Sequence, residues 1–63
     1  MTLYELRFFR PGAELPAVDR ADFADDRSAV MKGVSELLQM PSRERVEVWS
    51  GLRLVYSRTR TER

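Results

Sequence analysis

The chain has 63 residues, 43% of them hydrophobic, and its 11 basic and 10 acidic residues leave a formal net charge of +1. This length predicts one small domain, and the near-neutral charge argues against a strong general affinity for nucleic acid or anionic membranes. The sequence has neither cysteine nor histidine, which excludes disulfides, thiolate metal sites and the most common general base. We therefore predict that the protein is not an enzyme and holds no cofactor or metal.

No apolar run resembles a signal-peptide core or a membrane span. We therefore expect a cytoplasmic protein that does not bind a membrane. The densest acidic cluster lacks the alternating ligands and the central glycine of a calcium-binding loop, so it predicts an ordinary helix start and solvated carboxylates. Its members are Asp19, Asp22, Asp25 and Asp26.

Two strands are predicted before the helix. Residues 2–10 form the first, because apolar side chains alternate along it from Tyr4 to Phe8. Residues 15–23 form the second, and Pro16 restricts it to an edge of the sheet, since proline has no N–H to donate to a neighbouring strand. The same proline is expected to make that edge a poor contact for another chain.

One helix is predicted between Asp25 and Pro41. Asp25 is a suitable N-cap, because its carboxylate can accept hydrogen bonds from the free amides of the first turn. Gly33 costs the helix about 1 kcal/mol relative to alanine, so either the helix is weak there or another element approaches closely. Apolar residues then follow at helical spacing, namely Val30, Val34, Leu37 and Leu38.

Two short β-prone runs flank Gly51 and predict a β-hairpin over residues 46–56. A two-residue loop at Ser50-Gly51 would mix charged and aliphatic groups on each face. A three-residue loop ending at Gly51 instead places Glu47 opposite Arg53, a favourable charge pair. That loop also pairs Val48 with Leu52 and Val46 with Leu54 on the buried face, and we therefore favour it.

Together these elements predict a single α+β domain of ββαββ order over residues 1–57, followed by a flexible basic C-terminal tail over residues 58–63. The sheet is expected to be antiparallel with strand order 2-1-3-4, and the helix to pack on one face. The predicted core contains Tyr4, Leu6, Phe8, Val30, Val34, Leu37, Leu38, Val46, Val48, Leu52 and Leu54.

Three segments resemble a family of short uncharacterised proteins, mostly alphaproteobacterial. The resemblance covers roughly residues 3–56 and implies this fold and a bacterial cytosolic setting. It implies no activity and no catalytic residue. The segments that carry it are Tyr4-x-Leu6-x-Phe8, Ala24-Asp25-Asp26 and Val46-Glu47-Val48-Trp49-x-Gly51-x-Arg53-Leu54-Val55.

The sheet face away from the helix is the candidate functional surface. It could be a solvated face, a protein interface, or a platform for single-stranded RNA, whose bases stack on aromatic and arginine side chains. Trp49 could simply pack over the end of the hairpin or could anchor a partner. The residues predicted on this face are Leu3, Glu5, Arg7, Phe9, Arg45, Glu47, Arg53, Val55 and Ser57.

The favoured interpretation is a non-enzymatic protein-interaction module, with a homodimer through the open sheet face as one form of it. A 63-residue chain without disulfides gains stability by burying apolar surface in a partner. The alternative is weak binding of single-stranded RNA through arginines of the sheet face and the tail. The candidate interaction residues are Leu3, Arg7, Phe9, Glu47, Trp49, Arg53 and Val55.

Overall fold

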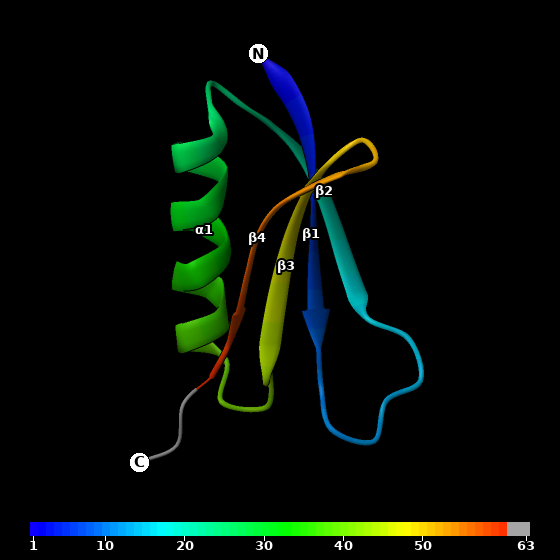
Figure 1. The fold of residues 1–63 in the computed structure, drawn as a ribbon. Coiled ribbons are helices and arrows are strands. Elements are labelled where there is room, and N and C mark those ends of the chain that lie inside the picture. The colour runs from blue at the N-terminus through cyan, green and yellow to red at the C-terminus, as the bar shows by residue number, and fades with distance from the viewer. Residues whose placement is uncertain (61–63) are drawn as a thin grey trace.

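The computed structural model describes residues 1–60 and contains four strands and one helix. All strand pairs are antiparallel, and the strand order is β2-β1-β3-β4. The helix lies along one face of this sheet, and the other face is left open (Figure 1). The predicted α+β fold, its ββαββ order and its strand order are confirmed. The elements are β1 (Thr2–Phe9), β2 (Ala17–Phe23), α1 (Asp26–Gln39), β3 (Arg45–Ser50) and β4 (Arg53–Thr59).

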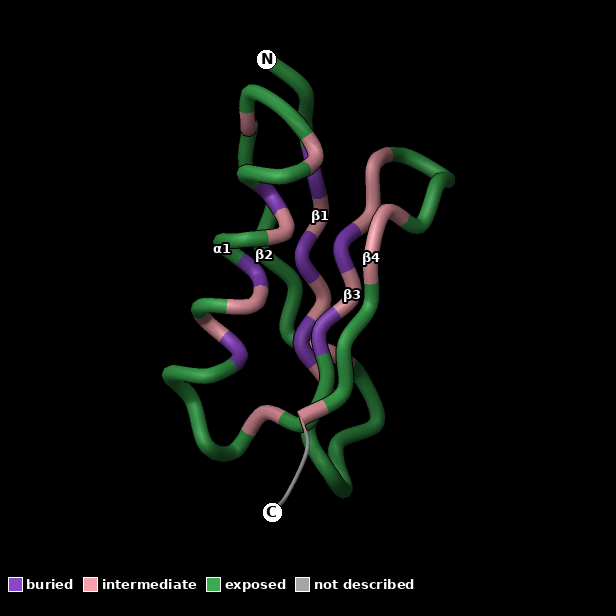
Figure 2. The backbone as a smooth tube through the Cα atoms, turned by 60° about the vertical axis from the view of Figure 1, so that its left-hand side comes forward, coloured by how far each residue is buried: buried purple, intermediate pink, exposed green. Residues whose placement is uncertain are grey.

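The core lies between α1 and the two central strands. Figure 2 shows the buried positions on β1, on β3 and on the side of α1 that faces them, whereas β2 and β4 are mostly exposed. Alternate residues of a strand point to opposite faces, so each central strand gives its apolar set to the helix side. The buried side chains of these strands are 3% exposed or less, namely Tyr4, Leu6, Phe8, Val46 and Val48.

The helix begins where the sequence predicts. Asp25 is its N-cap, and the Asp25 carboxylate accepts a hydrogen bond of 2.9 Å from the backbone N–H of Ser28. The buried residues Ala29, Gly33 and Leu37 follow at four-residue intervals and form the line that faces the sheet. A Cβ atom on Gly33 would lie 3.2 Å from a methyl group of Val48, so the glycine permits a close approach of α1 to β3.

Six of the predicted core residues are buried, and five are not. Tyr4, Leu6, Phe8, Leu37, Val46 and Val48 are buried as expected. On the helix, Val30 and Val34 are half-buried and Leu38 is 51% exposed, because the line of closest contact runs through the small residues Ala29 and Gly33. On the hairpin, Leu52 is 99% exposed and Leu54 is 45% exposed.

The hairpin explains those last two exposures, because its predicted register is wrong. Ser50 pairs with Arg53, so the loop is the two-residue Gly51-Leu52, and Leu52 sits at its tip. Gly51 has φ +60°, and within residues 1–60 only glycines have a positive φ, so Leu52 has a negative one. Glycine at the first loop position and a negative φ at the second are typical of a type II′ turn, whose twist matches that of the strands.

A bulge then shifts the rest of β4 by one residue. Trp49 pairs with Leu54, but Val48 pairs with Tyr56, so Val55 is an extra residue on β4. The bulge places Tyr56 opposite Val48 on the helix side, where both Tyr56 and the bulged Val55 pack against the core. No sequence pattern on the β3–β4 segment indicated this extra residue.

The expected domain boundary at residue 57 falls inside β4, which continues to Thr59. Beyond it, the backbone N–H of Arg60 donates a hydrogen bond of 2.6 Å to the carbonyl of Glu44. The Arg60 guanidinium donates to the carbonyls of Leu37, Met40 and Arg43 around the end of α1. Arg58 and Arg60 are therefore part of the domain, and the remainder of the predicted tail, residues 61–63, lies outside the described residues.

Candidate interaction surface

The open face of the sheet brings together five of the seven candidate interaction residues. Leu3, Arg7 and Phe9 come from β1, and Glu47 and Trp49 come from β3, where register places each of them on the side away from α1. Arg7 pairs with Glu47 across the two strands, and Glu5 pairs with Trp49. The face predicted from alternation is therefore correct for β1 and β3.

Arg53 and Val55 do not lie on this face. The bulge puts Val55 against the core, as described above. Arg53 lies on the helix side, where its guanidinium reaches the Asp26 carboxylate with two contacts of 3.3 Å. The Tyr4 hydroxyl donates a hydrogen bond of 2.5 Å to the same carboxylate. Arg53 thus links β4 to the start of α1 instead of pairing with Glu47, and the sequence-based expectation for both residues is corrected.

Trp49 is fixed between two charged neighbours. The Arg7 guanidinium lies 4.7 Å from the centre of the indole ring, within the range of a cation–π contact. The indole N–H donates a hydrogen bond of 3.0 Å to Glu47. Because the ring face and the N–H of the indole are both engaged and the residue is half-buried, Trp49 is held on the face and is not a free side chain at the hairpin end.

The contacts continue from Trp49 in both directions across the sheet. On one side, Glu47 forms an ion pair of 2.7 Å with Arg45, whose guanidinium lies 5.8 Å from the ring centre of Phe9. On the other, Arg7 pairs with Glu5, and Glu5 reaches Arg20 of β2 at 3.4 Å. We call this connected set the charge row, and its members are Phe9, Arg45, Glu47, Trp49, Arg7, Glu5 and Arg20.

The open face is electrically balanced, because Asp22 adds a third acidic side chain to the three cations and two anions of the charge row. The hydrogen bond that Arg7 donates lowers the pKa of Glu5 below its usual range, despite the partial burial of the carboxylate, and the charges of Arg7 and Arg20 act in the same direction. The face as a whole carries three acidic and three basic side chains, namely Glu5, Asp22, Glu47, Arg7, Arg20 and Arg45. It therefore offers no unbalanced field to a polyanion.

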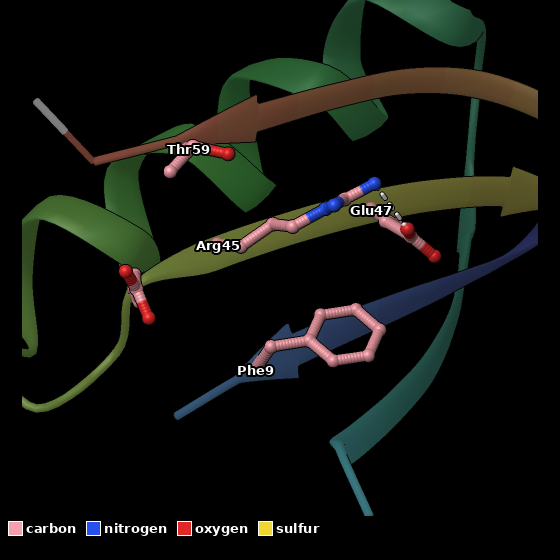
Figure 3. Close-up of a pocket in the computed structure, with 5 residues that line it drawn as sticks. Phe9, Arg45, Glu47 and Thr59 are labelled. Carbon is pink, nitrogen blue, oxygen red and sulfur yellow. Dashed lines mark hydrogen bonds and ion pairs between the residues drawn. The ribbon is translucent and has the colours of Figure 1, made fainter. Parts of the chain in front are cut away.

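A hollow of about 360 Å³ opens at the Phe9 end of the charge row (Figure 3). It is lined by Phe9, Glu44, Arg45, Glu47 and Thr59. The close-up shows Arg45 turned toward Glu47, with the Phe9 ring beside them and Thr59 on the neighbouring strand. Its lining combines one aromatic ring with charged and hydroxyl groups.

Sequence reasoning did not include β2 in the candidate surface. Its residues Val18, Arg20 and Asp22 point to the open side, opposite Arg7, Glu5 and Leu3 respectively. The sequence could have predicted this placement. Strand alternation puts these three residues on one face when the residues between them point to the helix side. The linkage of Tyr4, Asp26 and Arg53 had no such signal, since it joins three separate elements.

Within residues 1–60, no group of three or more acidic side chains lies close enough together to hold a metal ion. None of the described residues form a helix that is long and apolar enough to cross a membrane. The chain matches no protein-family model, no curated protein and no solved structure, so its likeness to short alphaproteobacterial proteins stays a prediction.

Proposed function

We propose that the protein is a non-enzymatic protein-interaction module and that the open sheet face is its contact surface. The observation that carries the proposal is the position of Trp49, which is held by Arg7 on its ring and by Glu47 at its N–H. Exposed apolar side chains lie on the same face, with Leu3 57% exposed and Leu54 45% exposed.

Such a surface has the composition that protein partners favour. Tryptophan and arginine are enriched among the residues that dominate binding energy, and aliphatic groups around them exclude water. An indole that is already fixed also loses little conformational freedom when a partner covers it, which lowers the entropic cost of binding.

A homodimer formed by stacking two open faces is the less favourable form of this proposal. Each copy would bring six charged side chains to the contact, and these are largely paired within their own sheet. Removing paired charges from water costs free energy that no new ion pair offsets. A partner that brings apolar groups over Trp49 and leaves the outer charges in water avoids most of that cost.

Capture from an extract of the source cells tests the proposal. The immobilised protein is compared with Trp49→Ala, with Phe9→Asp and with Leu52→Asp, which changes a 99% exposed side chain at the hairpin tip. We expect proteins that bind the wild-type chain and Leu52→Asp, and that both face variants lose by about tenfold or more, which corresponds to about 1.4 kcal/mol. Equal capture by all four chains would contradict a role of the open face.

Single-stranded RNA is the second candidate, because Phe9, Trp49 and the arginines beside them could stack on bases. The pairing of Arg7 and Arg45 with glutamates weakens this candidate, and so does the engagement of Arg60 by backbone carbonyls. We expect no gel shift with a single-stranded RNA at micromolar protein and low salt. A shift whose affinity falls steeply with salt would favour RNA over a protein partner.

A further inference from the structure

The outer edge of β2 is free to pair with another strand. β2 pairs with β1 on one side, and within residues 1–60 no strand pairs with its other side. Pro16, which was expected to block this edge, precedes the strand, and β2 begins at Ala17. No proline therefore interrupts β2, and the alternate backbone N–H and C=O groups that do not face β1 can extend the sheet.

The side chains of β2 carry a charge pattern that is complementary to itself. On the open side the strand presents Val18, Arg20 and Asp22, and directly opposite residues of an antiparallel pair lie on the same face. We propose that a second copy of the chain pairs with this edge, β2 against β2, with Ala21 opposite the partner's Ala21. Arg20 then faces the partner's Asp22, and Asp22 faces the partner's Arg20.

Charge and the position of Pro16 favour this register over the other registers of the same strand pair. A register centred on Asp19, Arg20 or Asp22 places two like charges directly opposite each other, which is unfavourable. A register centred on Val18 draws Pro16 into the ladder opposite Arg20, where proline cannot donate. Only the register centred on Ala21 creates opposite-charge pairs, and it creates two of them.

Both charges have capacity for the new contact. Within residues 1–60, Arg20 is bound through Nε alone, to Glu5 at 3.4 Å, and its side chain is 64% exposed. Among the described residues, Asp22 forms no ion pair. The partner's Asp22 would therefore continue the charge row beyond Arg20, and the row would run across the edge from one copy into the next.

The other edge of the sheet does not offer such a contact. The strand β4 contains Arg53 and Arg58 but no acidic residue, so two copies paired along it form no opposite-charge pair in any register. On the β2 edge the two copies form one eight-stranded sheet with both helices on the same side. The two open faces then become one continuous surface. This inference goes beyond the proposed function, because strand pairing at the edge does not require the open face to bind anything.

Charge exchange tests the pairing. Sedimentation equilibrium from micromolar to millimolar protein is measured for the wild-type chain, Arg20→Asp, Asp22→Arg and the double variant that carries both changes. We expect each single variant to weaken association by about tenfold or more, because like charges then oppose each other at two symmetric places. The double variant restores opposite charges and should recover most of the association.

Two comparisons keep this test specific. Arg58→Asp makes the same charge change on the β4 edge, and we expect it to leave association unchanged. Asp22→Arg removes neither partner of the Glu5–Arg20 ion pair, so deletion of that pair does not explain its effect. Thermal unfolding tests whether each variant is folded. A wild-type chain that stays monomeric over the whole range would overturn the inference, and so would a double variant no better than the single ones. Phe9→Asp reports separately whether two open faces stack. The test therefore distinguishes failure of the edge pairing from failure of the open face as a contact surface.

A single cysteine tests the register. The chain has no cysteine of its own, and opposite residues of an antiparallel pair have Cα atoms about 4.5–5.5 Å apart, within the span of a disulfide. Ala21→Cys should therefore give a covalent dimer with oxidised glutathione, which accepts the two electrons and two protons of the thiols. In the same register, residue 17 lies opposite the partner's residue 25. The two cysteines of Ala17→Cys would therefore be separated by eight positions along the paired strands, about 26 Å, and should cross-link far more slowly. Equal cross-linking by both variants would refute the register.

Discussion

On the helix side of the sheet, five side chains of β1 and β3 are 3% exposed or less, whereas the same two strands carry charged and aromatic groups on the open side. The helix side is held by close packing, and Gly33 allows that packing. The open side is held by contacts between neighbouring side chains that remain partly in water, where ion pairs contribute little to stability. A small domain can thus concentrate its stability on one face and leave the other available for binding.

The sharpest test of this contrast compares two leucines of the same strand. Leu6→Ala removes a side chain that is 2% exposed and should lower the free energy of unfolding by about 2–5 kcal/mol. Leu3→Ala removes one that is 57% exposed and should change it by about 0.5 kcal/mol or less. Urea unfolding followed by circular dichroism measures both, and similar costs would mean that the open face is packed against something in solution.

The next test concerns the end of the helix. Arg60→Ala removes the guanidinium that donates to the carbonyls of Met40 and Arg43 and should cost about 1–2 kcal/mol. Arg58→Ala, two positions earlier on an exposed part of β4, should cost about 0.5 kcal/mol or less. If the two variants unfold at the same denaturant concentration, the guanidinium does not stabilise the end of α1.

A smaller effect is expected from the hydroxyl of Tyr4. Its hydrogen bond, and then the contact with Arg53, lower the pKa of Asp26, and the same hydrogen bond raises the pKa of Tyr4. The Asp26 contribution is present above the unfolded pKa of about 3.9 and is lost as pH falls through the lower folded value. The Tyr4 contribution is present below about pH 10 and is lost as pH rises through the higher folded value.

Tyr4→Phe should therefore lower the thermal midpoint by a few degrees at neutral pH and by less at either extreme. Thermal unfolding of both chains between pH 2 and pH 11 measures the difference. A difference that does not change with pH would show that the variant acts through packing and not through the hydrogen bond to Asp26.

The smallest expected effect is on the open face. Arg7→Gln removes the cation over the indole and should change the free energy of unfolding by about 0.5–1 kcal/mol at most. Trp49 is the only tryptophan in the chain, so its fluorescence reports the change directly, and we expect a shifted emission maximum. An unchanged spectrum would mean that Arg7 does not rest on the ring in solution.

The sequence was sufficient for the central strands and the element order, because alternation and helical spacing are local signals. It was insufficient for the hairpin, because a glycine with positive φ suits both the end of a three-residue loop and the start of a two-residue loop. The bulge at Val55 then conceals the register, since the apolar residues of β4 do not alternate in step with those of β3.

The helix illustrates a different limit. Apolar spacing directed attention to Val30, Val34 and Leu38, but the line of closest contact runs through Ala29 and Gly33. Small residues add little hydrophobic signal to a sequence, and their importance lies in the close approach they permit. The contacts of Arg20, Arg53 and Arg60 join elements that are distant in sequence, so no local pattern could have assigned their partners.

The strand order also has a consequence for how the chain folds. The β1–β2 and β3–β4 pairs are hairpins between neighbouring segments, whereas the central β1–β3 pair joins residues as distant as Glu5 and Trp49, 44 positions apart. Closing that long loop costs chain entropy before any contact between the hairpins is gained, so we expect their docking to limit the folding rate. Substitutions at the β1–β3 seam should then slow folding, and substitutions in the Gly51-Leu52 turn should mainly accelerate unfolding.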